Sequence, residues 1–395
     1  MTTNSQLSTI NHPHPHVAVI ILNWNGFQDT LECLHSVFEN SYQNYSIYLV
    51  DNASKEDELN RLKRYIDRHQ ETKKTHIPRA KIHFIQNKEN LGFAEGNNVA
   101  IRAALKDGAD YIFTLNNDTV VDPKFLSEAI KALSLRGVEG FQEGDDVAIS
   151  PHSARKTGIV ATKMVNYYQR TKLDNTGHDL LTTGDTIPRD RNNPVSMVNG
   201  QLAHSMRSQW SHVHPFGSCA GASLYSAPML KEIGLFDKDF FLNYEDADLS
   251  LRAITRGWSI VYCPSSIVHH KINQSIKKIK NTSYRIRSQR NQLWAYLHNA
   301  PWLVILLNLP WILLRDLFVI AVSFITFRWT ITKIFICSRY EVLKSFSKIW
   351  KKRKRVQKHR KISGLDFWLR QKSFLTTYLK YFWQIVIKRQ NSVME

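Results

Sequence analysis

Short apolar runs alternate with helical patterns over the N-terminal third of the chain, and this alternation constrains the fold more than any other feature. The runs are 17–24, 45–52, 82–87 and 111–116, and the helical patterns between them fall at 30–40, 56–69 and 95–105. Strands that are apolar throughout are buried on both faces, and strands separated by helices usually pair in parallel. The sequence therefore predicts an α/β fold with a largely parallel, doubly wound sheet covered by helices on both faces.

Polar residues follow three of these strands where each one ends. Asn23 and Asn25 lie at and just after the end of the first, Asp51 lies at the end of the second, and Asn117 and Asp118 follow the fourth. The carboxyl ends of parallel strands meet at one edge of the sheet, where such folds bind nucleotides. The Asp51 carboxylate could accept hydrogen bonds from a base or ribose, or it could cap the next helix. Asp118 is a candidate metal ligand, with a simple strand-ending turn as the alternative.

The sequence lacks the usual phosphate-binding loops. No GxGxxG motif follows the first strand and GxxxxGK[ST] occurs nowhere, so neither a nicotinamide-type site nor a P-loop is supported. A divalent cation on one or two carboxylates, with or without a histidine, is another way to hold a diphosphate. Gly92 and Gly96 would allow close backbone approach beside such a site, or would only let the loop turn.

Three acids lie within four residues in the segment FFLNYEDADLSL, namely Glu245, Asp246 and Asp248. Clustered carboxylates beside apolar residues raise one another's pKa, which can turn a weak acid into a general base. The alternative is a solvated helix start in which the acids favour the positive end of the helix dipole.

Six segments carry a resemblance to a known family. They read VAVIILNWNG, YLVDNAS, NLGFAEGNN, TLNNDT, GASLYSAPMLKEIGLFDKDFFLNYEDADLSLRAITRGW and VHHKINQS. In this order they resemble glycosyltransferase family 2 of the GT-A fold, and most closely its rhamnosyltransferase-like branch. The resemblance implies a Rossmann-like mixed sheet flanked by helices in a catalytic domain at 17–299, with a nucleotide-binding half at 17–122 and an acceptor-binding half at 123–299. The family's DxD motif falls at 116–118, where only Asp118 matches.

The resemblance also implies a role for individual residues. Asp246 would be the base that takes the proton from the acceptor hydroxyl. Asp118 and His270 would bind Mg2+ or Mn2+, although the adjacent His269 leaves the choice of histidine open. Five side chains would contact the donor nucleotide: Asn23, Asn25, Asp51, Asn97 and Asn117. Three residues would support the acceptor side: Glu245, Asp248 and Gly221.

The implied reaction is a single displacement that inverts the anomeric carbon of the sugar. The donor would be a nucleoside diphosphate sugar, with dTDP or UDP as the carrier and rhamnose as a candidate sugar. The acceptor would be a lipid-linked or cell-surface glycan, and the region 150–224 would shape its pocket. A catalytically silent membrane scaffold with the GT-A fold is the alternative.

The chain changes character in its last quarter, 300–395, which we expect to be helical and to associate with a membrane. The segment 303–327 is apolar except for Asn308, Arg315 and Asp316, and it is long enough to span a bilayer. Because the two central charges are costly there and Pro310 weakens a helix, we expect two shorter pieces lying in the membrane interface. A buried helical hairpin is the alternative.

A basic block at 351–361 accounts for much of the formal net charge of +19. Beside an apolar segment and aromatic flanks at Phe367, Trp368, Phe382 and Trp383, it favours anionic lipid headgroups. We therefore expect a peripheral or monotopic protein at the cytoplasmic face of the cell membrane, preceded by a flexible leader at 1–16. A solvated helix face is one alternative. Nucleic-acid binding is another, but it is not expected, because the predicted crevice is acidic.

Overall fold

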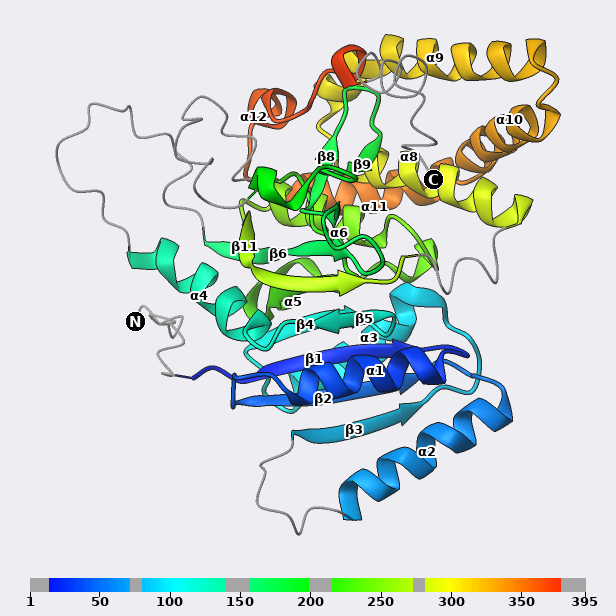
Figure 1. The fold of residues 1–395 in the computed structure, drawn as a ribbon. Coiled ribbons are helices and arrows are strands. Elements are labelled where there is room, and N and C mark those ends of the chain that lie inside the picture. Colours follow the sequence, from blue (N-terminus) through cyan, green and yellow to red (C-terminus); the bar gives the residue numbers. More distant parts are fainter. Residues whose placement is uncertain (1–13, 72–79, 139–155, 199–214, 273–280, 378–395) are drawn as a thin grey trace.

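The computed structural model describes residues 14–71, 80–138, 156–198, 215–272 and 281–377 (Figure 1). Within these residues a nine-stranded sheet has the order β3-β2-β1-β4-β10-β6-β11-β5, with β7 paired to β6, and β8 and β9 form a separate hairpin. The strands are β1 (Val17–Asn23), β2 (Tyr45–Asp51), β3 (Lys81–Gln86), β4 (Tyr111–Asn116), β5 (Thr119–Val121), β6 (Thr157–Asn166), β7 (Leu173–Asn175), β8 (His178–Leu180), β9 (Thr186–Pro188), β10 (Ala222–Ser226) and β11 (Ser259–His270).

The four strands predicted from the sequence form the parallel part of this sheet. β1 pairs in parallel with β2 and β4, and β2 pairs in parallel with β3. The sheet then becomes mixed, because β10 runs antiparallel between β4 and β6, and β5 runs antiparallel to β11. Asn23 is paired with Asp51, and the neighbouring Leu22 with Asn116, so the three strand ends lie at one edge as predicted.

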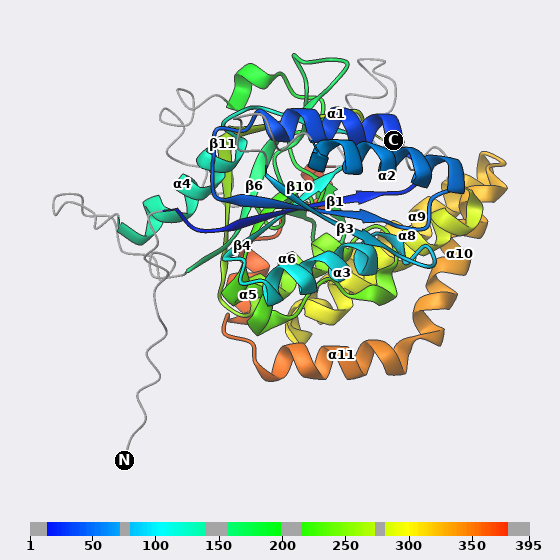
Figure 2. The same ribbon diagram turned by 90° about the horizontal axis from the view of Figure 1, so that it is seen from below.

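Helices cover both faces of the sheet, as the apolar strands predict (Figure 2). They include α1 (Phe27–Phe38), α2 (Glu56–Glu71) and α4 (Phe125–Val138) on one face, and α3 (Gly92–Lys106), α5 (Ala227–Ile233) and α6 (Glu245–Thr255) on the other. In β1, alternate side chains enter the two cores: Val19 packs in the core of Leu34, and Ile20 in the core of Ile101. This follows from the two-residue period of a strand.

The described part of the C-terminal quarter, 300–377, is helical, as expected, with α9 (Trp302–Ile325), α10 (Trp329–Lys344), α11 (Phe346–Lys358) and α12 (Gly364–Leu369). The helix α8 (Thr282–Asn299) precedes it. The prediction of two shorter pieces over 303–327 is wrong, because α9 is one continuous helix with Pro310 inside it. Its two charges need no break in the helix, since Arg315 is buried and pairs with Asp185, and Asp316 pairs with Arg339 of α10.

The described part of the predicted leader is attached to the fold. His16 N donates to Asp110 Oδ2 at 2.8 Å, and Tyr42 Oη donates to the carbonyl oxygen of Pro15 at 2.5 Å. The rest of the leader, 1–13, lies outside the described residues, as do the aromatic flanks Phe382 and Trp383.

Candidate active site

A cavity of about 630 Å³ opens at the carboxyl edge of the parallel strands. Its walls come from the end of β4, the start of α3, the β7–β9 region, the loops before β10 and α6, the end of β11 and the start of α8. Six of the predicted site residues line it: Asn117, Asp118, Gly221, Glu245, Asp246 and His270. The fold thus brings the candidate metal, base and acceptor-side residues to one cavity.

Asp118 and His270 line one corner of the cavity, and the buried Asp174 lies behind His270. His270 Nε2 lies 3.3 Å from Asp118 Oδ1, and His270 Nδ1 lies 2.8 Å from Asp174 Oδ2. Burial acts to lower the pKa of His270, but the charges and hydrogen bonds of the two carboxylates outweigh it and raise that pKa to about 10. Burial likewise acts to raise the pKa of Asp174, but His270 and Arg191 hold it below its usual range. In the absence of a cation the imidazole is therefore a protonated bridge between two carboxylates.

The structure decides between the two adjacent histidines. Successive side chains of a strand point to opposite faces, so only one of them can face Asp118. That residue is His270, whereas His269 Nδ1 is buried and has no hydrogen-bond partner among the described residues. His270 therefore lies at this corner, and its role as a metal ligand stays a prediction.

This corner fits a divalent cation. Two ligands bonded to one cation at about 2.1 Å lie roughly 3 Å apart when they are at right angles. Asp118 Oδ1 and His270 Nε2 are 3.3 Å apart. Asp174 supplies the carboxylate that typically orients a metal-binding histidine through its second ring nitrogen. Cation binding would require His270 to lose a proton.

Glu245 and Asp246 begin α6 at the cavity. Asp246 Oδ2 accepts a hydrogen bond from Ala220 N at 3.1 Å, and Oδ1 accepts one from Ala247 N at 2.7 Å. Glu245 is buried, and its Oε2 has no hydrogen-bond partner in the described part of the chain. Burial and then the charge of Asp246 raise the pKa of Glu245 well above its usual range. The expectation of a raised pKa is confirmed for Glu245.

The same expectation is wrong for Asp248. This side chain is buried away from the cavity, where it binds Arg252 at 2.8 Å, Asn299 at 2.9 Å and His298 at 3.5 Å. Burial acts to raise its pKa, but Arg252 and His298 hold that pKa far below the usual range. Two residues along a helix turn a side chain by about 200°, so Asp248 cannot share the face of Asp246.

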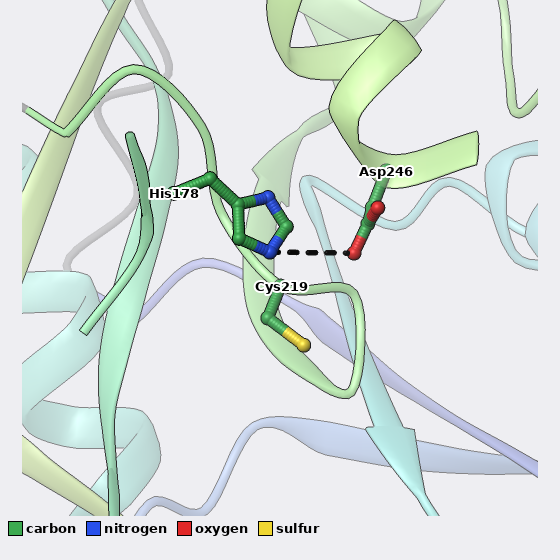
Figure 3. Close-up of side chains that lie close together, drawn as sticks. All are labelled: His178, Cys219 and Asp246. Atoms are coloured by element: carbon green, nitrogen blue, oxygen red, sulfur yellow. Dashed lines mark ion pairs between the residues drawn. The ribbon is translucent and has the colours of Figure 1, made fainter. Parts of the chain in front are cut away.

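His178 and Cys219 lie beside Asp246 (Figure 3). The ligand atoms of the three side chains all lie within 4.8 Å of one another, and His178 Nε2 is 4.0 Å from Asp246 Oδ2. Burial and then the charge of Asp246 raise the pKa of the Cys219 thiol far above its usual range. Because the thiolate is the metal-binding form of cysteine, this trio is poorly prepared for a cation. It is better described as the wall of the pocket beside the candidate base.

Four of the predicted donor-binding residues do not line the cavity formed by the described residues. Asp51 is fully buried and accepts hydrogen bonds from Asn23 Nδ2 at 2.9 Å and Ser54 N at 3.1 Å. Asn25 N donates to Ser54 Oγ at 2.9 Å, and Asn97 Nδ2 donates to the carbonyl oxygen of Phe93. These bonds fix the strand ends and α3, so donor contacts for Asn23, Asn25, Asp51 and Asn97 stay predictions.

A strained loop leads into α6. Phe241, Asn243 and Tyr244 all have positive φ, which is uncommon for residues other than glycine and concentrates at functional sites. The carbonyl oxygen of Phe241 accepts a hydrogen bond from Phe93 N at 2.6 Å, and Gly92 packs so closely that a Cβ there would lie 2.4 Å from that oxygen. The glycine therefore permits a close approach of α3 to this loop, and α3 begins at Gly92, three residues before the predicted start.

Several residues of the site were not predicted from the sequence. Asp174, His178 and Arg191 come from the region 150–224, which was expected only to shape the acceptor pocket. No motif marks them, and of the three only His178 lies in the polar run NTGHD. Asn52, beside the predicted Asp51, also lines the cavity, and its Oδ1 accepts a hydrogen bond from Leu91 N at 3.1 Å.

A family model matches the first part of the chain. Residues 18–142 match the model described as Glycosyl transferase family 2. This segment contains the parallel strands and Asp118, and the match supports glycosyltransferase family 2 for it. Among curated protein sequences, none matches this chain.

Solved structures were compared with this chain, and one of them shares its fold at a TM-score of 0.50. A mannosyltransferase from Pyrobaculum calidifontis in complex with GDP-Man and Mn2+ is 16% identical, with 84% of this chain and 87% of that chain covered and a TM-score of 0.50. The S. aureus protein TarS in complex with UDP is 12% identical over 84% of this chain and 91% of that chain, with a TM-score of 0.42. The mixed sheet flanked by helices is the GT-A fold that the sequence predicts.

Proposed function

We propose that this chain, a glycosyltransferase with the GT-A fold, moves a sugar from a nucleoside diphosphate to a hydroxyl of a lipid-linked or cell-surface glycan, with inversion of the anomeric carbon. The observation that carries the proposal is the joint presence of Asp118 with His270, and of Asp246, on one cavity. The first pair has the chemistry to hold a cation and a diphosphate, and Asp246 has the chemistry of a base.

Each site residue has a separate role in the proposed reaction. A cation held by Asp118 and His270 would neutralise the charge that develops on the leaving diphosphate. Asp246 takes the proton of the acceptor hydroxyl, and the acceptor oxygen forms a bond to the anomeric carbon as the bond to the diphosphate oxygen breaks. Since attack comes from the face opposite the leaving group, the configuration is inverted.

The sequence resemblance favours rhamnose on dTDP or UDP. The mannosyltransferase of the same fold was solved with GDP-Man and Mn2+, which supports testing Mn2+ beside Mg2+ and including guanosine diphosphate sugars.

A donor-hydrolysis screen tests the proposed function. The full chain is incubated with dTDP, UDP and GDP sugars and with Mg2+ or Mn2+, and nucleoside diphosphate release is measured. We expect release from one class of donor, dependent on the cation. Asp118→Ala should lose the cation-dependent part of donor binding in calorimetry. If no donor is consumed or bound, the chain is a scaffold and the proposal is wrong.

The proposal also includes the cellular location of the protein. We place the protein at the cytoplasmic face of the cell membrane, bound to anionic lipids. The helix α8 supports a lipid-linked acceptor, because its Tyr284 and Arg287 line the cavity while the same helix packs against α10 and α11. Mass spectrometry of the products formed on extracted lipid-linked glycans would identify the acceptor and its linkage.

A further inference from the structure

The outer side of α9 is apolar along its whole length. Every exposed side chain of this helix is apolar, and these residues define the α9 face: Trp302, Leu303, Leu306, Leu307, Leu309, Pro310, Trp311, Leu313, Leu314, Leu317, Phe318, Ala321, Val322, Phe324 and Ile325. Leu317 and Phe318 are 66% and 64% exposed. The helix lies at the rim of the molecule, beyond α8 (Figure 1). Soluble proteins seldom expose so continuous an apolar surface, which marks an interaction site.

The polar residues of α9 all face the protein. Asn308 Nδ2 donates to Tyr296 Oη and to Gln371 Oε1, both at 2.8 Å. Arg315 is buried and pairs with Asp185 of the β8–β9 turn, and Asp316 pairs with Arg339 of α10. Among the described residues, α9 alone is long and apolar enough to cross a membrane. Crossing would break these buried ion pairs, whereas lying flat keeps all of them.

The apolar surface continues through aromatic residues into a basic one. The rings of Trp302 and Trp350 of α11 are 6.3 Å apart, and the ammonium of Lys354 lies 5.7 Å from the ring of Trp350. The adjoining end of α10 exposes Tyr340 and Leu343. Tryptophan and tyrosine at the border between apolar and charged residues are typical of the membrane–water interface.

Not all of the basic block is available to a partner. Arg353 is buried and donates to the carbonyl oxygens of Leu297 and Ala300, and Lys352 pairs with Asp237 and Asp239. Four of its side chains on α11 remain exposed: Lys351, Lys354, Arg355 and Lys358. Arg360, just beyond the end of α11, is exposed as well, whereas Lys361 pairs with Glu232. The predicted lipid contact of 351–361 therefore falls on these five side chains.

We propose that the α9 face and the exposed basic side chains of α11 together form a monotopic docking surface for an anionic lipid bilayer. The helix α9 lies in the interface with its apolar side in the acyl region, and α11 meets the headgroups. The charge argues for a bilayer and against a second copy of this chain, because two copies paired here would bring their basic helices together. The surface does not depend on the proposed transfer reaction, so its test can fail or succeed independently.

Vesicle flotation of the full chain tests the surface. The protein is mixed with phosphatidylcholine vesicles or with vesicles that also contain phosphatidylglycerol, at low and high salt. We expect tighter binding to the anionic vesicles, weakened by salt. Leu317→Glu with Phe318→Glu should lower the partition coefficient by roughly 100-fold, since each buried side chain of this size contributes about tenfold or more. Lys354→Gln with Lys358→Gln should cost roughly fivefold per residue on anionic vesicles only.

Matched controls keep the result interpretable. Met197 is an exposed apolar residue on the short helix Val195–Val198, and Met197→Glu should leave vesicle binding unchanged. Nucleotide release by the Glu variants, measured without vesicles, reports whether the fold is intact; their thermal melting serves if the parent chain releases none. Equal binding by parent and Leu317→Glu/Phe318→Glu would overturn the proposal. The proposal would also be overturned if the parent chain did not bind vesicles and instead formed a stable dimer that Leu317→Glu with Phe318→Glu dissociates.

Discussion

Replacing Asp246 with asparagine removes the proposed base and keeps the shape of the side chain. Both carboxylate oxygens accept a backbone hydrogen bond, from Ala220 N and Ala247 N. Asparagine has one accepting oxygen, so its NH2 group must face one of these two backbone N–H groups. The lost hydrogen bond should lower the free energy of unfolding by about 1 kcal/mol, since the side chain is only partly exposed. The variant should therefore fold.

The effect on transfer should be far larger than the effect on stability. Losing a general base costs about a hundredfold to ten-thousandfold in rate, or roughly 3–5 kcal/mol of barrier. Donor binding should be largely preserved, because the Asp118–His270 corner does not include Asp246. Initial rates at saturating donor and acceptor, with donor affinity from calorimetry, separate the two effects.

Glu245→Gln is the matched control. Burial and the charge of Asp246 raise the pKa of Glu245 well above its usual range and so favour its neutral form. A neutral amide of the same shape should therefore change the transfer rate by no more than about fivefold, or 1 kcal/mol. A near-normal turnover of Asp246→Asn, or equal losses in both variants, would refute the assignment of the base.

Three further substitutions probe the surroundings of the site. Asp174→Asn removes the carboxylate behind the corner histidine and should weaken Mn2+ binding by about 10–100-fold in a titration. Asp248→Asn should cost roughly 3 kcal/mol of unfolding free energy at neutral pH. Its basic partners hold the folded-state pKa of Asp248 low despite burial, so this stability is present above about pH 4 and is lost as the pH falls through the folded-state pKa. Urea unfolding of the parent and the variant should show that the difference between their unfolding free energies shrinks over this pH range. A difference that stays constant with pH would contradict the pairing. Gly92→Ala places a Cβ 2.4 Å from the Phe241 carbonyl oxygen and should destabilise more than Gly108→Ala, which has a similar positive φ and open space; equal melting temperatures would refute the close contact.

Local patterns in the sequence determined the parallel half of the fold. The runs ending near Asn23, Asp51 and Asn116 each report burial on both faces, and this property depends on a few consecutive residues. Once the strands are parallel neighbours, their ends must meet at one edge. The position of Asp118 on the cavity follows from these two facts alone.

Helix periodicity was present in the sequence but was not enough to assign the acids. The three acids of α6 look equivalent as a cluster, yet Asp246 faces the cavity, Glu245 is buried with a raised pKa, and Asp248 is paired with Arg252. A turn of 100° per residue separates Asp248 from Asp246. The environment that raises the pKa of Glu245 comes from the residues packed around it. No local sequence pattern predicts that environment.

Tertiary structure alone decided which distant residues complete the site and how the C-terminal helices are placed. Asp174 reaches His270 from almost a hundred residues away, and Asp185 reaches Arg315 from further still. Such pairs have no sequence period, because long-range contacts depend on how whole elements pack. The sequence showed that α9 is apolar in composition. It did not show on which side of the helix the charged residues lie. That side keeps Arg315 and Asp316 inside the protein and leaves a continuous apolar face for a membrane.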